Sequence, residues 1–149
     1  MFGPEDHFTN RFAALARMAP VLPLVGEATR LQPVFVGDVG NAVADAVDGK
    51  ARPGAVYELG GPEVMTMREV VEAILRITGR NSLLMQLPFG LARLNAAFLQ
   101  FAPGDFKLTP DQVDLLRSDN VVSEAAKAAG LTLEGLGLTP DSLEAVTPS

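Results

Sequence analysis

Apolar residues recur at helical spacing most clearly between residues 55 and 79. Thr66 and Glu69 stand at the spacing of a capping box, and Gly79 suits the positive φ at which a helix ends. One face of the helix between them is apolar at the i, i+3, i+4, i+7 positions: Met67, Val70, Val71, Ile74, Leu75 and Thr78. A short apolar run over 55–59 and a Gly-Gly-Pro turn come before this helix. The stretch predicts a strand-turn-helix unit that lies on a sheet.

The rest of the chain predicts further strands and helices in alternation. Strands are expected at 30–36, 55–59 and 82–87, long helices at 6–19, 39–47, 66–79 and 88–101, and three short helices after Thr109, Ser123 and Thr139. Pro20 and Pro23 are expected to end the first helix and extend the chain. This order predicts an α/β protein. Three strands are fewer than the five or six of a free-standing doubly wound domain. Either the sheet is small and helix-dominated, or its strands join others.

Length and composition set the class of protein. A chain of 149 residues suits one domain, 1–149, with an α-β-α-β-α part (1–79) and a mostly helical part (80–149). The net charge of -6 and the scattered basic residues argue against nucleic-acid binding. The absence of cysteine excludes disulfides, thiolate zinc sites and cysteine nucleophiles. We expect no signal peptide, and no apolar run approaches the length of a membrane span; the nearest, 88–103, is broken by polar residues.

Two motifs bear a faint likeness to those of dinucleotide enzymes. The run Gly37-Asp38-Val39-Gly40 lies between a predicted strand and a predicted helix, but Val43 stands where a third glycine is needed. Helix capping by Asp38 is the favoured alternative. Four residues after Tyr57, the only tyrosine, stands Gly61 instead of lysine, so Tyr-x-x-x-Lys is absent.

No residue is predicted to be catalytic or to bind a metal. His7, the only histidine, has Asp6 beside it but no nucleophile or metal partner in view. The turn Gly60-Gly61-Pro62 follows a predicted strand end, where α/β sheets place ligand loops, although chain reversal alone also explains it. Arg30 and Arg52 are candidates for binding an anionic substrate, with a solvated surface role as the alternative.

Four segments in this order resemble the C-terminal part of extended or atypical short-chain dehydrogenases. They are Phe2 to Phe8, Gln32 to Val39, Val56 to Glu63, and Leu115 to Lys127. The pattern is closest to the NAD(P)H-binding accessory subunit of respiratory complex I and its bacterial relatives. The resemblance implies the C-terminal portion of a Rossmann-like fold, with few short strands and mostly helices. It also implies that the chain is truncated and lacks the N-terminal dinucleotide-binding half.

The resemblance gives roles to individual residues and implies partners. Phe2, Gly3 and Pro4 would lie near the nicotinamide end of NAD(P), which this chain would not bind alone. The substrate side would be lined by Arg30, Val36, Asp38, Gly60, Gly61 and Pro62. A protein partner is implied, either complex I or a second copy in a homodimer, at a cytoplasmic location or peripheral to the inner membrane. A structural accessory module that binds partners through its apolar helices is the alternative function.

Overall fold

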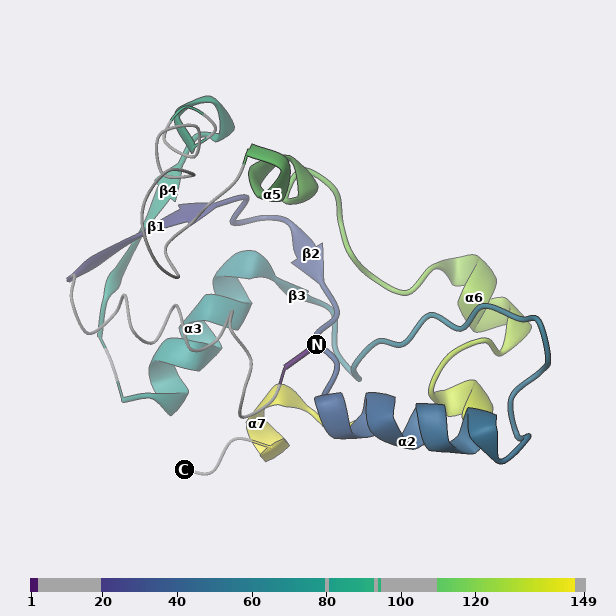
Figure 1. Cartoon of the computed structure of the whole chain (residues 1–149). Coiled ribbons are helices and arrows are strands. Elements are labelled where there is room, and N and C mark those ends of the chain that lie inside the picture. The colour runs from purple at the N-terminus through teal and green to yellow at the C-terminus, as the bar shows by residue number, and fades with distance from the viewer. Residues whose placement is uncertain (3–19, 80, 93, 95–109, 147–149) are drawn as a thin grey trace, which may run out of the picture. The chain divides into compact units, whose positions relative to one another are not determined.

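The computed structural model describes residues 1–2, 20–79, 81–92, 94 and 110–146 (Figure 1). The chain divides into two compact units. Unit 1 comprises Met1–Asp6, Gln32–Val64 and Val121–Ser149, and unit 2 comprises His7–Leu31 and Met65–Asn120. Each unit is therefore assembled from segments that lie far apart in the sequence. The helix expected at 6–19 and most of the one expected at 88–101 lie outside the described residues; 89–92 and 94 are helical.

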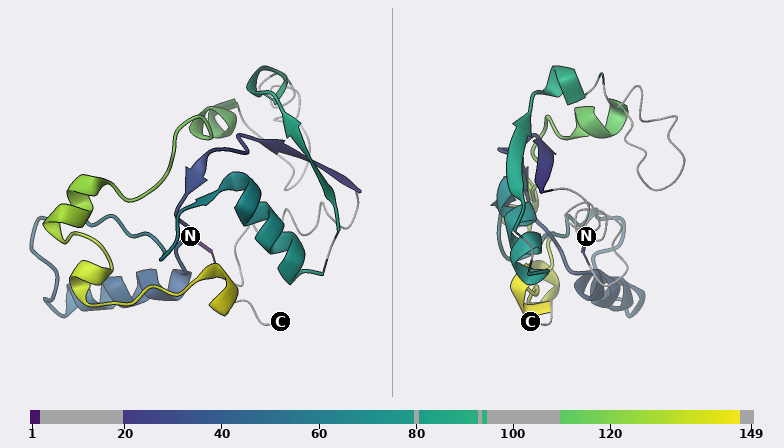
Figure 2. Two further views of the ribbon diagram at one scale, coloured as in Figure 1. Left: turned by 180° about the vertical axis from the view of Figure 1, so that it is seen from behind. Right: turned by 90° about the vertical axis from the view of Figure 1, so that its left-hand side faces the viewer.

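Unit 2 is built on a pair of parallel strands and the helix that connects them. Strands β1 (Val21–Val25) and β4 (Leu83–Leu87) pair in register from Val21 with Leu83 to Val25 with Leu87. Helix α3 (Met67–Ile77) lies beside this pair (Figure 2). The core between them consists of buried apolar side chains: Leu22, Leu24, Met67, Val71 and Leu75. The strand predicted at 82–87 is confirmed, whereas β1 was not predicted because Pro23 lies inside it. A two-stranded ladder tolerates this proline, since β1 is an edge strand.

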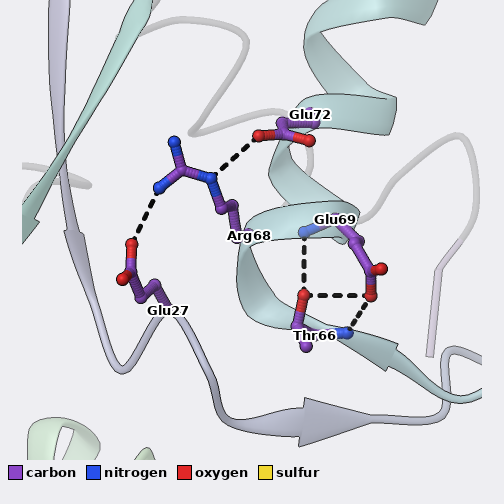
Figure 3. A network of polar contacts seen from close by, with 5 residues as sticks. All are labelled: Glu27, Thr66, Arg68, Glu69 and Glu72. Carbon is purple, nitrogen blue, oxygen red and sulfur yellow. Dashed lines mark hydrogen bonds and ion pairs between the residues drawn. The ribbon is translucent and has the colours of Figure 1, made fainter.

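The start of α3 is fixed by side chains and by the preceding loop, as Figure 3 shows. The backbone N–H of Glu69 donates to Thr66 Oγ1, and the Glu69 carboxylate accepts from the backbone N–H of Thr66, which confirms the predicted capping box. Arg68 forms ion pairs with Glu27 at 2.8 Å and with Glu72 at 3.0 Å (Figure 3). Gly79 follows the helix at φ +63°, as the sequence predicts.

Two of the predicted strands are corrected by the structure. The strand expected at 30–36 is limited to β2 (Arg30–Leu31), which pairs antiparallel with β3 (Met65–Thr66). Pro33 has no N–H to extend the ladder, and helix α2 (Val36–Val47) has already begun at residue 36. The segment 55–59 is not a strand, because no described strand pairs with it.

Unit 1 contains α2 and the C-terminal elements. These are α6 (Glu124–Ala129), the 3₁₀ turn η1 (Glu134–Leu136) and α7 (Leu143–Val146). The core of unit 1 contains Val34, Ala42 and Leu133, with Leu59 at its margin. The short helix after Ser123 is confirmed: Ser123 Oγ accepts from the Ala126 N–H and Gly130 ends the helix at φ +67°. The last helix is present but begins later than expected: residues 139–142 are not helical, α7 begins at Leu143, and Ser142 Oγ accepts from the Ala145 N–H.

Helix α5 (Pro110–Leu115) belongs to unit 2. Its Val113 is fully buried with Ala92, and Val25, Leu87 and Phe89 pack around them. The helix start predicted near residue 109 is thus confirmed. Among the described residues, none of the helices is both long enough and apolar enough to cross a bilayer.

Candidate substrate-side site

The turn Gly60-Gly61-Pro62 is the best-defined part of the predicted site. Both glycines are buried, and Pro62 is exposed. A Cβ at Gly60 would lie 2.5 Å from Val122 and 2.6 Å from the Gln32 side chain, and a Cβ at Gly61 would overlap the carbonyl of Pro33. The two glycines therefore bring three segments of unit 1 into close contact.

Gln32 holds this turn from within unit 1. Its Nε2 donates to the carbonyl of Gly61 at 2.7 Å, and its Oε1 accepts from the backbone N–H of Val122 at 2.9 Å. One amide side chain thus satisfies two partly buried backbone groups on segments that are about sixty residues apart. The turn and the start of the C-terminal region are joined through it.

Glu58 makes a second connection between the same two segments. Its carboxylate accepts from the backbone N–H of Ser123 at 2.7 Å and from the Ser123 hydroxyl at 2.9 Å. These two hydrogen bonds to the charged form, the backbone bond first, lower the pKa of Glu58 below its ordinary value. Glu58 is therefore an ionised anchor for α6.

The structure places Phe2 close to residues 34–36. Phe2 is buried and forms a parallel bridge with Phe35, its N–H donating to Val34 and its carbonyl accepting from Val36. The two phenyl rings lie 5.8 Å apart. Gly3 and Pro4, predicted with Phe2 to lie near the nicotinamide, are outside the described residues.

The other predicted substrate-side residues are dispersed. Asp38 is buried and does not cap α2; the N-cap is Phe35, and the Asp38 carboxylate accepts from the backbone N–H of Asp141 at 2.8 Å. The favoured capping role of Asp38 is wrong because α2 begins at Val36, three residues before the predicted start at Val39. Val36 is in the first turn of α2 and is exposed. Arg30 belongs to unit 2, where it forms an ion pair with Asp119 at 2.8 Å.

Two hydrogen bonds join Arg30 to Asp119, and a third joins Arg30 to Asn120. The backbone N–H and the Nε of Arg30 both donate to the Asp119 carboxylate, and the Asn120 N–H donates to the Arg30 carbonyl. The first two bonds lower the pKa of Asp119. A substrate anion at Arg30 would have to compete with this carboxylate.

The N-termini of α2 and α3 do not fit a dinucleotide pyrophosphate. Such a group needs free backbone N–H groups at a helix N-terminus. At α3, the N–H groups of Met67 and Arg68 already donate to the carbonyls of Thr29 and Glu27. At α2, the Val36 N–H donates to Phe2, and the buried Asp38 carboxylate in the first turn would repel a phosphate.

Catalytic chemistry likewise has little support among the described residues. The hydroxyl of Tyr57 accepts from the Arg52 N–H at 3.1 Å, a contact within its own loop. A cluster of three or more potential metal ligands is not found in the described part of the chain.

Solved structures define the class of fold. The chain is similar to the NADPH-dependent quinone oxidoreductase of Escherichia coli, solved with NADPH, with TM-score 0.61 and 16% identity over 91% of this chain and 47% of that one. It is also similar to the dTDP-4-dehydrorhamnose reductase of Clostridium acetobutylicum, with TM-score 0.54 and 16% identity over 78% of this chain and 46% of that one. The fold is an α/β fold of the Rossmann-like reductase type with few strands, as the sequence predicts.

Comparison with curated sequences shows similarity to one particular protein, a subunit of NADH dehydrogenase. Over 97% of its length the chain is 33% identical to the mitochondrial NADH dehydrogenase [ubiquinone] 1 alpha subcomplex subunit 9 of Arabidopsis thaliana, and 32% identical to that of Rattus norvegicus. It spans 37% of the length of each. No family model matches the chain. The predicted resemblance to the complex I accessory subunit and to short-chain-dehydrogenase-like reductases is confirmed.

Three residues that support the site were not predicted to take part in it. They are polar residues inside or beside apolar segments: Gln32, Glu58 and Ser123. This position is the only feature of the sequence that could have indicated their role. Their partners are backbone groups of distant segments, so sequence spacing does not reveal the contacts.

Proposed function

We propose that this chain is the C-terminal, substrate-side region of an NAD(P)-binding, short-chain-dehydrogenase-like protein related to the complex I accessory subunit, and that it is not catalytic alone. The observation that supports this most directly is the alignment: nearly the whole chain matches little more than a third of each relative's length. The occupied N–H groups at the N-termini of α2 and α3 agree with it.

In this proposal, the cofactor is held mainly by the dinucleotide-binding half of the Rossmann-like fold. By the resemblance, Phe2, Gly3 and Pro4 are assigned to its nicotinamide end, and the Gly60–Pro62 turn, Val36 and Asp38 are assigned to the substrate side. Titrating NADH and NADPH into the isolated chain, followed by nicotinamide fluorescence and calorimetry, tests this assignment. We expect no saturable binding below millimolar concentration. A micromolar Kd would contradict the proposal.

A structural accessory role is the second candidate. Leu91 and Leu94, on the described start of the segment predicted as an apolar helix, are exposed, as is Leu115 of α5. These side chains support binding to a protein partner, with complex I as the partner that the relatives suggest and the inner-membrane surface as the place. Native gels of the source membranes test it, because an accessory subunit would migrate with NADH dehydrogenase activity. A chain found only as a free monomer would contradict it.

A further inference from the structure

The parallel strand pair of unit 2 has two edges, and they differ in what they offer to a further strand. The Leu83 N–H donates to the Pro20 carbonyl at 2.9 Å, and β1 and β4 are paired over their whole length. Alternate residues of a strand direct their N–H and C=O groups to opposite sides. Leu83 therefore directs these groups toward β1, whereas Leu84 and Gln86 direct theirs to the opposite edge. No described strand pairs with that edge.

The outer edge of β1, in contrast, is closed by a proline. The same alternation directs Pro23 away from β4, and Pro23 has no N–H to donate to a neighbour. Proteins protect the edges of sheets with proline or with charged side chains. β4, with the sequence Leu-Leu-Met-Gln-Leu, contains neither. Within the described part of unit 2, the outer edge of β4 is therefore the unprotected one.

The side chains of β4 leave one face of the pair open beside this edge. Leu84 packs against the core that β1 forms with α3, so the residues on either side of it face away from α3. These are Leu83 and Met85, which are 74% and 55% exposed. Exposed apolar side chains beside an unprotected edge are typical of a strand that pairs with another chain.

We propose that the outer edge of β4 pairs antiparallel with the same edge of a second copy, about a two-fold axis at Met85. Leu84 then lies opposite Gln86 of the second copy, and these two residues exchange two hydrogen bonds; the axis generates the same pair again. On the open face, Met85 lies opposite Met85 of the second copy, and Leu83 lies opposite its Leu87.

The edge of β4 is complementary to itself in this register, which favours a second copy over an unrelated chain. Each N–H that points outward meets an outward C=O, apolar side chains meet apolar side chains on the open face, and no charge within β4 has to be buried. The interface is isologous and closed. Because Pro23 closes the outer edge of β1, the joined sheet ends at β1 of each copy and does not grow into a fibre.

The helices fit this arrangement without overlap. The two-fold axis is perpendicular to the sheet, so α3 of both copies lies on the same face. Each α3 packs on its own strand pair, and the centres of the two pairs are two strand spacings apart, about 9.6 Å. Packed helices lie about 8–10 Å apart. The two copies of α3 therefore pack side by side as a second layer of the contact.

The size of the contact makes the dimer a weak one. A strand of 5 residues is about 17 Å long, and the strand and helix layers together are about 20 Å deep, so the contact covers roughly 340 Å² in projection. Stable complexes bury about 800 Å² per partner. The dimer should therefore form at high protein concentration and dissociate on dilution.

Sedimentation of the full chain over a hundredfold range of concentration tests the association, and we expect a monomer–dimer equilibrium. Met85→Lys places two like charges opposite each other at the axis and should raise the dimer Kd at least tenfold. Val21→Lys is the matched control. It adds the same charge to the same face of the sheet, but on β1 and away from the axis, and should leave the Kd unchanged.

Oppositely charged variants separate a loss of pairing from a loss of folding. Met85→Glu alone should also raise the Kd, whereas an equimolar mixture of Met85→Glu and Met85→Lys should dimerise at least as well as the parent chain. A parent chain that is monomeric at every concentration would overturn the proposal. So would a dimer that Met85→Lys does not weaken.

A disulfide tests the register. Because the chain contains no cysteine, Met85→Cys introduces a unique thiol, and across the axis the two Cα atoms would be about 4.5 Å apart, which a disulfide spans. Oxidised glutathione should link most of this variant into a covalent dimer. Leu83→Cys, at the more exposed of the two positions, would lie about 14 Å from its copy and should stay unlinked. Equal cross-linking of both variants would assign the contact to random collision or to another register and overturn the proposal.

Discussion

The Glu58 carboxylate accepts both the backbone N–H and the hydroxyl of Ser123, at 2.7 and 2.9 Å, across a sequence separation of 65 residues. The same serine hydroxyl accepts from the Ala126 N–H and so caps α6. Glu58 thereby fixes the start of α6 beside the Gly60–Pro62 turn. Together with Gln32, this charged side chain joins the substrate-side loop to the C-terminal region of unit 1.

This contact predicts a dependence of stability on pH. The folded-state pKa of Glu58 lies below the ordinary glutamate value of about 4.3. The contact therefore contributes fully above that pH, and its contribution is lost as the pH falls through the folded-state pKa. We expect the difference in thermal midpoint between the parent chain and Glu58→Gln to be largest near neutral pH and to shrink below pH about 4.

Thermal unfolding followed by circular dichroism from pH 3 to 7 measures this difference. Glu69 and Asp119 also have lowered pKa values, but they are present in both proteins and cancel in the comparison. A difference that stays constant across the range would contradict the role of the charged Glu58.

Gln32 is expected to stabilise unit 1 through its amide. Gln32→Leu keeps the approximate size of the side chain but leaves the Gly61 carbonyl and the Val122 N–H without their partner. Unsatisfied, partly buried groups of this kind cost about 1–3 kcal/mol each when water does not replace the bond. Urea denaturation should show a loss of about 2–6 kcal/mol if both groups stay unsatisfied, and less where water replaces a bond. Gln32→Glu, which retains only acceptors, should lose the bond to Gly61 and keep the bond to Val122.

Thr66→Ala should destabilise α3. The substitution removes the side-chain acceptor for the Glu69 N–H, and the loss of an N-cap typically costs about 1 kcal/mol. Thr66→Ser retains the hydroxyl and should behave like the parent chain. Hydrogen exchange at the amide of Glu69 provides a local readout, which should accelerate in the alanine variant only.

Two glycine substitutions should have opposite effects on stability. Gly61→Ala places a methyl group against the Pro33 carbonyl, so the turn must shift, and we expect a loss of about 1–3 kcal/mol. Gly40→Ala enters open space in the middle of α2 and should stabilise the isolated chain by about 0.5–1 kcal/mol. Urea midpoints of the two variants, measured side by side, test the pair, and a stabilising Gly61→Ala would show that the turn is not packed as described.

Local sequence determined the elements whose signals lie within one turn or one short run. The Thr66–Glu69 box, the apolar face of α3, the end at Gly79, the strand at 82–87 and the start of α6 at Ser123 were predicted correctly. The helical features depend on contacts between residues three or four apart, or on a backbone preference of one residue. The strand was marked by its apolar run, although its partner β1 is distant in sequence. The resemblance to the reductase fold and to the complex I subunit followed from ordered segments and was confirmed as well.

Only the tertiary structure decided which residues far apart in the sequence are in contact. It also decided whether 55–59 forms a strand and whether Asp38 caps α2. Residues 55–59 have the composition of a strand, but a strand exists only where a neighbour supplies hydrogen bonds, and no described strand does so. Asp38 has the residue type of a cap, yet α2 begins at Val36, and its carboxylate binds the backbone of Asp141. Gln32 and Glu58 join the turn to the C-terminal region because folding brings distant backbone groups within hydrogen-bond distance, which no local spacing can encode.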